Sequence, residues 1–290
     1  MAPFPSWTKE WHSEPYPAIS PTRPELSSAG RVVVITGGGS GIGAAIARAF
    51  ALAGSEKIAI ISRTQSRLDK TKAEIEAKHP HTKVLAVAAD ITREADINNA
   101  FDKIEEVFGK IDVYVSNSAW MSSGAKIAES ETAEWWQGFE TNVLGAFLSF
   151  KAFHKHASPK GAYILNIDSG IAHMPPIPTL VSAYAGSKAA ATKLFDYIAF
   201  EYPEYHVVNI QPGVVDTELN QKSTVRGTDH VDLPGHFAVW LTSPEAVFLR
   251  NKFVWVNWDV DELKARKNEI GKETFTTTLS GVSFADWVGF

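Results

Sequence analysis

The segment Tyr184-Ala185-Gly186-Ser187-Lys188 sets a phenol and an ammonium four residues apart. On a helix this spacing places both side chains on one face, within reach of the same ligand. A free tyrosine has a pKa near ~10, which is too high for proton exchange at neutral pH. A fixed cation beside the phenol favours the phenolate, and a drop of about three pH units corresponds to ~4 kcal/mol. The pair therefore predicts acid–base chemistry at an oxygen atom, with Lys188 lowering the pKa of Tyr184.

Two further polar residues fit the same chemistry. Ser169 follows a short β-branched run and is expected to donate a hydrogen bond to the reacting oxygen. Asn142 follows a helical stretch, Glu134–Glu140, and its side-chain amide is expected to hold a water that connects Lys188 to solvent. A Tyr-x-x-x-Lys pair by itself is a common surface arrangement, so this interpretation depends on the rest of the chain.

A glycine-rich string lies about 150 residues before Tyr184, directly after a short apolar run. Glycine permits a tight turn, a close approach of the backbone to a pyrophosphate, and close packing of a helix on a strand. The N–H groups of the helix that follows then face the phosphates. We therefore predict dinucleotide binding by Gly37, Gly39, Ser40, Gly41, Ile42 and Gly43.

The ends of the next apolar runs also carry polar residues. The second run ends at Ser62 and Arg63, with no carboxylate to bind the ribose 2′-hydroxyl of NAD. Arg63 could instead pair with a 2′-phosphate, which favours NADP(H) over NAD(H). Asp90 closes the third run and Asn117 lies at the end of the fourth. Ligands in open α/β sheets bind beyond the carboxyl ends of the strands, so these residues are expected near the adenine and ribose.

The elements that must position these residues alternate along the chain. Near-continuous apolar runs are typical of strands buried on both faces, and helical stretches with one charged face lie between them. The expected strands are Val32–Ile35, Ile58–Ile61, Val84–Ala88, Val113–Ser116, Tyr163–Ile167, Val207–Ile210 and Phe253–Val256, and the expected helices include Ile42–Ala53, Leu68–Lys78 and Ile97–Phe108. The pattern predicts an α/β fold with one doubly wound, seven-stranded, mostly parallel sheet, a Rossmann-like single domain.

Composition divides the chain into three parts. Residues 1–29 form a proline-rich arm, residues 30–260 the catalytic and dinucleotide-binding domain, and residues 261–290 a tail. The tail ends in the apolar segment Phe284–Phe290. Exposed apolar ends usually find a partner surface, so we expect the tail to pack at a subunit boundary.

Charge and cysteine content exclude several classes of protein. A net charge of −5 gives no basic field for a nucleic acid. With no cysteine, the chain has no disulfide, thiolate metal site or cysteine nucleophile. No apolar run approaches the ~18 residues of a membrane helix, and we expect a cytoplasmic protein. The pairs His79/His81 and His154/His156 lack acidic neighbours at ligand spacing, so no metal site is predicted.

These motifs together resemble the short-chain dehydrogenase/reductase family, in its compact single-domain branch, from about Arg31 to Val260; the arm and tail are similar to those of fungal members. The resemblance implies NAD(P)(H) and a catalytic tetrad of Asn142, Ser169, Tyr184 and Lys188. It implies that Tyr184 is the general acid or base and that Lys188 contacts the nicotinamide ribose. It also implies that Val215 and Thr217 meet the nicotinamide carboxamide, and that the chain forms dimers or tetramers.

Three departures from the family pattern concern the substrate side and its surroundings. The segment Ser116–Ala119 lacks the usual glycine, Asp168 stands before the serine, and fifteen residues separate Ser169 from Tyr184. Strand alternation predicts that Asp168 points away from Ser169, outside the mechanism. Apolar and aromatic segments at this edge favour a hydrophobic substrate: Trp120, Met121, Trp135-Trp136, His173–Pro178 and Thr217–Trp240.

We therefore expect an oxidoreductase that transfers a hydride between NADP(H) and a carbonyl or secondary alcohol of a hydrophobic small molecule. Two alternatives stay open at this point. The fold and cofactor could serve a non-redox isomerase, dehydratase or cyclase, or the chain could be a nucleotide-sensing binding protein.

Overall fold

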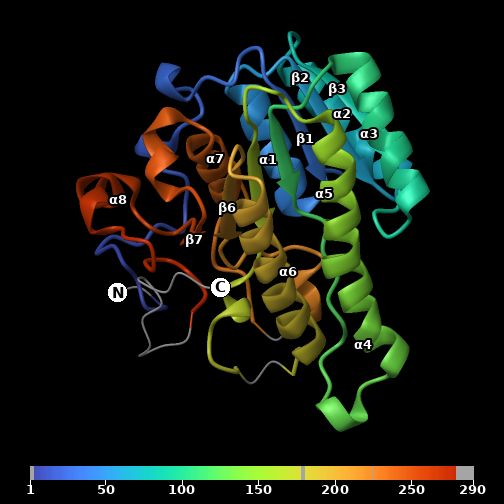
Figure 1. The fold of residues 1–290 in the computed structure, drawn as a ribbon, viewed down its shortest axis with the longest axis vertical. Coiled ribbons are helices and arrows are strands. Elements are labelled where there is room, and N and C mark those ends of the chain that lie inside the picture. Colours follow the sequence, from blue (N-terminus) through green and yellow to red (C-terminus); the bar gives the residue numbers. More distant parts are fainter. Residues whose placement is uncertain (1–2, 178–179, 224, 279–290) are drawn as a thin grey trace.

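A computed structural model describes residues 3–177, 180–223 and 225–278. Its centre is a seven-stranded sheet in the order β3-β2-β1-β4-β5-β6-β7, in which every neighbouring pair is parallel (Figure 1). The strands are β1 (Val32–Thr36), β2 (Lys57–Ser62), β3 (Lys83–Ala88), β4 (Val113–Ser116), β5 (Tyr163–Ile167), β6 (His206–Gln211) and β7 (Lys252–Trp255). Each predicted strand is present and differs by at most one residue at either end, which confirms the fold class.

Helices cover both faces of the sheet. They are α1 (Gly41–Leu52), α2 (Gln65–Lys78), α3 (Glu94–Phe108), α4 (Thr132–Phe139), α5 (Gly145–His156), α6 (Ser182–Glu201), α7 (Asp232–Leu241) and α8 (Val260–Ala265). A π-helical turn, η4 (Glu140–Leu144), joins α4 to α5, and a 3-10 turn, η5 (Gly170–Ala172), follows β5. Gly54 lies two residues after the end of α1 with a φ of 87°, a left-handed conformation that favours glycine at a helix end.

Alternation along the strands divides the core in two. In β1, Val33 and Ile35 pack in a cluster with α1, α2 and α7, whereas Val32 and Val34 pack in a second cluster with α3, α5 and α6. Both faces of a parallel sheet are buried in this way, which is why its strands are almost wholly apolar. The even-numbered residues at the end of β5 consequently face α6.

The strand order reverses between β1 and β4, since β1 pairs with β2 on one side and with β4 on the other. Connections leave this point in opposite directions, so a crevice opens beyond the carboxyl ends of the two strands. The glycine-rich string and Asn117 lie side by side at this crevice.

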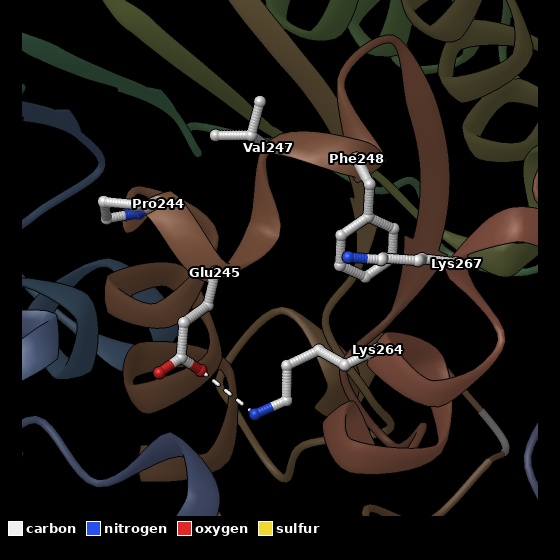
Figure 2. A pocket seen from close by; sticks show the side chains of 6 residues that line it. All are labelled: Pro244, Glu245, Val247, Phe248, Lys264 and Lys267. Carbon is white, nitrogen blue, oxygen red and sulfur yellow. Dashed lines mark hydrogen bonds and ion pairs between the residues drawn. The ribbon is translucent and has the colours of Figure 1, made fainter.

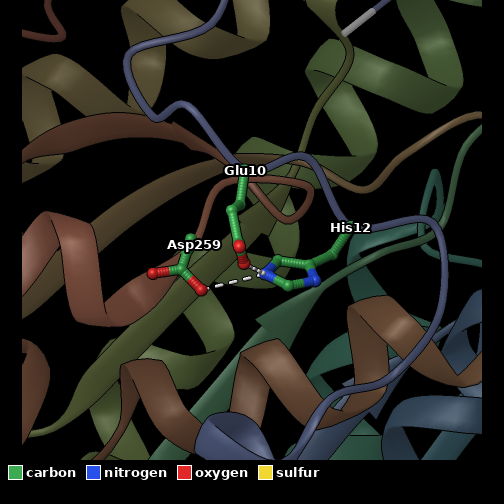
Figure 3. A group of neighbouring side chains, drawn as sticks. All are labelled: Glu10, His12 and Asp259. Carbon is green, nitrogen blue, oxygen red and sulfur yellow. Dashed lines mark hydrogen bonds and ion pairs between the residues drawn. The ribbon is translucent and has the colours of Figure 1, made fainter. Parts of the chain in front are cut away.

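The arm lies against the edge of the sheet near β7 and α8, and one joint is formed by Glu10, His12 and Asp259 (Figure 3). His12 Nε2 lies 2.9 Å from Asp259 Oδ2 and 3.9 Å from Glu10 Oε2. The other oxygen of Asp259 accepts the backbone N–H of Glu262 at 2.8 Å and so caps α8. Because both Asp259 oxygens have partners within the chain, we interpret this group as a joint between the arm and α8.

A second joint is centred on Glu245, in the surface groove shown in Figure 2. The Glu245 carboxylate accepts three hydrogen bonds. Arg23 of the arm donates from Nη2 at 2.5 Å, Lys264 of α8 donates from Nζ at 3.2 Å, and Trp240 donates from its indole N–H at 3.2 Å. The guanidinium hydrogen bond is the main cause of a pKa of about 2 for Glu245. One carboxylate thus links the arm, α7 and α8.

The described part of the tail covers the free edge of β7. Phe275 O accepts the Phe253 N–H at 2.7 Å, and Lys252 Nζ donates to Gly271 O at 2.6 Å. The Phe275 ring also contacts Trp7 and Trp258. These contacts lie within one chain, and Phe284–Phe290 lies outside the described residues, so the expected role at a subunit boundary stays a prediction. Among the described helices, none is long and apolar enough to cross a membrane.

The histidines set aside in the sequence have structural partners. His154 Nδ1 bonds the Tyr205 hydroxyl at 2.8 Å. His156 Nδ1 bonds Glu105, and its Nε2 lies 3.0 Å from Asp102. His156 has no acidic residue at ligand spacing in the sequence, but α3 brings two carboxylates to it at the end of α5.

Candidate active site

The glycine-rich string forms a narrow turn between β1 and α1. Gly37 and Gly41 have φ values of 71° and 53°, which favour glycine. A Cβ on Gly43 would lie 2.3 Å from Gly37 O, so a side chain there would force the turn open. Asn117 Nδ2 donates to Thr36 O at 2.9 Å and fixes the same turn. Asn117 thus shapes the loop through the β1 backbone.

Two serines beside this turn have hydroxyls that fit a bound nucleotide. Ser40 is exposed at the start of α1 and makes no side-chain capping hydrogen bond. Ser62 Oγ is buried, and within the described chain it has no hydrogen-bond partner. It lies 3.1 Å from the position of a Cβ on Gly39. An orphaned hydroxyl next to a glycine cradle fits the phosphates and ribose of a dinucleotide.

Charged residues follow at the ends of β2 and β3. Arg63 is exposed and forms no ion pair with another described residue. Although burial raises the pKa of Asp90, hydrogen bonds from Thr92 and the charge of Arg63 lower it overall. The sequence analysis missed Arg67, whose Cβ lies 3.2 Å from the position of a Cβ on Gly39. Its Nη1 pairs with Glu218 at 2.8 Å, across the cleft from α2.

The segment after β6 comes back over the glycine turn. Thr217 Cγ2 lies 3.3 Å from the position of a Cβ on Gly41, so Thr217 packs directly on the dinucleotide loop. Val215 is buried and forms a bridge with Asp229. Of the two residues expected at the nicotinamide, only Thr217 therefore has its side chain at the loop, and Val215 can contribute only its backbone.

The proposed catalytic side chains come together where α6 passes the end of β5. Lys188 is buried and donates from Nζ to Ile167 O at 2.7 Å. The same Nζ lies 5.9 Å from the centre of the Tyr184 ring. The Ser169 side chain lies close enough to the Tyr184 phenol to lower its pKa. The four-residue spacing thus places phenol and ammonium in one site, as predicted.

The electrostatic prediction for Tyr184 was wrong. Its pKa is raised, first by burial and second by the charge of Asp168, while the hydrogen bond with Ser169 lowers it only in part. The Lys188 ammonium is directed at Ile167 O, and burial lowers its own pKa. Without a bound cofactor, Tyr184 is therefore a neutral phenol at pH 7, ready to donate a proton.

Asn142 lies in the π-helical turn η4, and its side chain is already occupied. Its Oδ1 accepts the Trp120 N–H at 2.8 Å, and its Nδ2 donates to Trp120 O and to Ser187 Oγ, each at 2.9 Å. Both N–H groups of the amide have protein partners, so the amide joins the loop after β4 to α6. The expected water on this side chain stays a prediction.

Asp168 lies next to the proposed catalytic side chains. It faces α6, the helix that carries Tyr184 and Lys188. Its Oδ1 accepts the Ser169 N–H at 2.9 Å, and its Oδ2 accepts the Thr192 hydroxyl at 2.5 Å. These contacts arise from the packing of α6 on the end of β5, which strand alternation alone does not reveal.

The apolar segments expected around the substrate divide into two groups. Trp120 lies under the Lys222 ammonium, 4.7 Å from the ring centre, and Lys222 Nζ donates to Met121 O at 3.0 Å. Trp135 Nε1 donates to Ser182 Oγ at the start of α6. Trp136, in contrast, is exposed, and Trp240 is fully buried in the core under α7. The expected substrate edge therefore does not extend to Trp240.

The segment His173–Ile177 follows η5, and Pro178 lies outside the described residues. A cavity of about 310 Å³ lies behind it, lined mainly by apolar side chains of β7, the arm and the tail. The ring centres of His173 and Phe253 lie 4.5 Å apart. This segment thus packs against β7, the edge of the sheet that the arm and tail also cover.

Comparison with known proteins identifies the family of this chain. The family model described as short chain dehydrogenase matches residues 31–226. A short chain dehydrogenase/reductase of Claviceps purpurea (strain 20.1) is 36% identical over 274 residues, which cover 92% of this chain and 91% of the relative. The short chain dehydrogenase/reductase nsrO of Aspergillus novofumigatus is 34% identical over 267 residues, covering 88% and 90%.

Solved structures are similar in fold. A 3-ketoacyl-(acyl-carrier-protein) reductase from Brucella melitensis, complexed with NADH, is 27% identical with a TM-score of 0.72, covering 80% of this chain and 98% of that one. An alcohol dehydrogenase from Thermococcus sibiricus, complexed with 5-hydroxy-NADP, is 26% identical with a TM-score of 0.70, covering 78% and 95%. The chain belongs to the short-chain dehydrogenase/reductase family, whose enzymes act on CH–OH or C=O groups.

Proposed function

We propose that this enzyme uses NADP(H) to reduce a carbonyl group of a hydrophobic small molecule, with Tyr184 as the general acid. One observation carries the proposal. The Tyr184 phenol and the buried Lys188 ammonium lie on one face of α6 at the end of β5, with the Lys188 Nζ 5.9 Å from the centre of the Tyr184 ring. A neutral phenol in this position donates a proton without first having to acquire one.

The residues divide the work of the reaction between them. NADPH, when bound, supplies the hydride that reduces the carbonyl carbon. The Ser169 hydroxyl donates a hydrogen bond to the carbonyl oxygen and polarises it, and Tyr184 gives that oxygen its proton. The proton and hydride together convert the carbonyl to an alcohol. Lys188 stabilises the phenolate left on Tyr184, and the reverse sequence oxidises an alcohol.

We propose NADP(H) over NAD(H) because two arginines lie beside the Ser62 hydroxyl and the Gly39 turn. Arg63 is exposed and unpaired among the described residues, and Arg67 lies in the first turn of α2, with its Cβ against Gly39. A guanidinium suits a 2′-phosphate. Arg63→Ala is expected to weaken NADPH binding roughly 10-fold or more and NADH binding little, measured by fluorescence titration. Equal losses for the two cofactors would contradict this preference.

We further propose that the chain is a homo-oligomer. Phe147 of α5 and Phe200 of α6 are 43% and 81% exposed, which favours a covered surface. To test the tail separately, a chain ending at Thr278 retains the contacts that cover β7 and removes only residues 279–290. A lower mass in solution would support the tail at a subunit boundary, and an unchanged mass would contradict it.

The reaction class is tested by absorbance at 340 nm. Hydrophobic ketones and secondary alcohols are screened with NADPH and NADH, and product is measured in the same samples. The proposal expects one mole of NADPH consumed per mole of alcohol formed. Product without a change in NADPH would instead indicate an isomerase, dehydratase or cyclase, and cofactor binding without product would indicate a nucleotide-sensing protein.

A further inference from the structure

The direction of the Ser169 side chain depends on the backbone at the start of the turn η5, and two side chains hold that backbone. Asp168 Oδ1 accepts the Ser169 N–H at 2.9 Å, and Gln211 Oε1 accepts the Gly170 N–H at 2.7 Å. These N–H groups belong to the two peptide planes that flank the Ser169 Cα. Because a residue has only two soft backbone angles, φ and ψ, the two hydrogen bonds together fix the direction of the Ser169 Cα–Cβ bond.

Gln211 belongs to a different element, the end of β6, and its amide reaches across to η5. The residue is 6% exposed, so this contact is shielded from water. Its Nε2 lies 3.5 Å from Gly213 O, in the segment that follows β6. The same segment leads to Thr217, which packs on the dinucleotide loop at Gly41. One side chain therefore contacts both the turn that carries Ser169 and the backbone that leads to the dinucleotide loop.

The packing around Gly170 leaves the turn little room for another arrangement. Gly170 is buried, and a Cβ on it would lie 2.9 Å from the Trp255 ring and 3.1 Å from Met174 Sδ. Gln211 and Trp255 are register partners in β6 and β7, so the sheet places both of these neighbours of Gly170. Without the Gln211 oxygen, the buried Gly170 N–H would lose this acceptor, and the turn would have to shift to find another.

We propose that Gln211 is a positioning residue that holds the Gly170 N–H and so directs the Ser169 hydroxyl at the reacting carbonyl oxygen. This inference rests on the proposed function, in which Ser169 polarises that oxygen. Gln211 acts through Ser169 and takes no part in the transfer of the proton or the hydride. Its effect on rate should be substantial, because a displacement of about 1 Å at a reacting group can cost about 10²-fold.

The test compares Gln211→Met, Gln211→Glu and Asn257→Leu with the wild type, using NADPH and the ketone that is reduced fastest in the absorbance screen. Gln211→Met keeps the shape of the side chain and removes its acceptor oxygen. It should lower kcat roughly 10- to 100-fold, with KM for the ketone and the affinity for NADPH within about threefold of the wild type. Fluorescence titration with NADPH counts the folded sites, so a loss of folded protein is not read as a loss of kcat.

The other two variants separate positioning from a general effect on stability. Gln211→Glu keeps an acceptor oxygen for the Gly170 N–H, so its kcat should stay within about fivefold of the wild type. Asn257→Leu is the matched control: Asn257 is 1% exposed and donates from its amide to His12 O of the arm at 2.8 Å. Losing this amide should lower the melting temperature and leave kcat within about twofold.

The outcomes separate this inference from the proposed function. A wild type without redox turnover, or a Ser169→Ala enzyme with undiminished kcat, would overturn the proposed function itself. If the wild type is active and depends on Ser169, an unchanged kcat in Gln211→Met would overturn the role of Gln211 alone. Equal losses of kcat in Gln211→Met and Asn257→Leu, or in Gln211→Met and Gln211→Glu, would indicate a structural role and would also overturn it.

If Gln211→Met does not fold, Gln211→Asn takes its place in the same comparison. The asparagine amide is one methylene shorter and cannot reach the Gly170 N–H from the same backbone position, so the same loss of kcat is expected. A Gln211→Asn enzyme with the kcat of the wild type would overturn the proposal.

Discussion

Asp168 in the catalytic cluster and Glu245 in the arm joint are both carboxylates with cations nearby, yet they behave in opposite ways. The pKa of Asp168 is raised to about 6, chiefly by burial, although Lys188 opposes the shift. The pKa of Glu245 is lowered to about 2, chiefly by the hydrogen bond from Arg23. Glu245 touches its cations directly at a partly open surface, whereas Lys188 directs its Nζ at Ile167 O.

This difference in pKa indicates different roles for the two regions. A direct ion pair at a partly exposed joint stabilises the native chain, since desolvation there is modest. A buried carboxylate with no direct cation contact costs stability, because its desolvation is only partly offset. We therefore expect changes in the catalytic cluster to affect turnover, and changes at the arm joint to affect stability.

The largest effect should come from Tyr184→Phe. Removing the phenolic hydroxyl abolishes the proton donor, and kcat should fall by roughly 10²–10⁴. NADPH binding should be nearly unchanged, and the melting temperature should stay within about 2 °C. Tyr197→Phe, which alters an exposed tyrosine on the same helix, is the matched control. A Tyr184→Phe enzyme that keeps most of its turnover would show that another group is the acid.

The arm joint should show the reverse pattern with Glu245→Gln. The amide is neutral and cannot attract Arg23 and Lys264 as the carboxylate does, so the free energy of unfolding should fall by about 1–3 kcal/mol. Urea unfolding measures this loss, and kcat is expected to stay within about twofold. A large loss of turnover at unchanged stability would contradict the expectation that the arm joint affects stability and not catalysis.

Stability should depend on pH with opposite signs in the two regions. Folding raises the pKa of Asp168 from 3.8 to about 6, so its contribution declines as the pH rises through this window. Folding lowers the pKa of Glu245 from 4.5 to about 2, so its contribution is full above pH 4.5 and is lost as the pH falls toward 2. Melting curves of Asp168→Asn and Glu245→Gln across pH 2–7 should each lose one of these two slopes. Identical pH dependence in both variants would refute the comparison.

The smallest effect should come from Lys222→Ala. Lys222 belongs to the active-site loops but is an exposed cation over the Trp120 ring, and such contacts contribute only about 0.5–1 kcal/mol. We expect KM to rise by about two- to fivefold, with the melting temperature unchanged. This variant tests whether the effect of a charged group on catalysis depends on its burial and not only on its place in the active-site loops.

Much of the architecture followed from patterns that act locally. Apolar runs placed β1 to β7, because strands buried on both faces need apolar residues throughout. The glycine string placed the dinucleotide turn, since Gly37 and Gly41 require backbone angles that other residues avoid. The four-residue spacing placed Tyr184 and Lys188 together, because the α-helical repeat fixes that relation.

Features that depend on distant segments could not be obtained in this way. Arg67 at the Gly39 turn, the hydrogen bonds of the Asn142 amide, and the acidic neighbours of His156 each arise from contacts between separate elements. The pKa of Tyr184 is the clearest case. Its sign depends on burial and on Asp168, neither of which is visible in the spacing of two residues.

By itself the sequence determined the order of strands and helices, the glycine turn and the shared helical face of the phenol and ammonium, since these follow from periodicity and backbone sterics. Only the tertiary structure decided which charges act on that phenol. Electrostatic interactions depend on distance and desolvation in three dimensions, and the packing of α6 on the end of β5 sets both for Tyr184, Lys188 and Asp168.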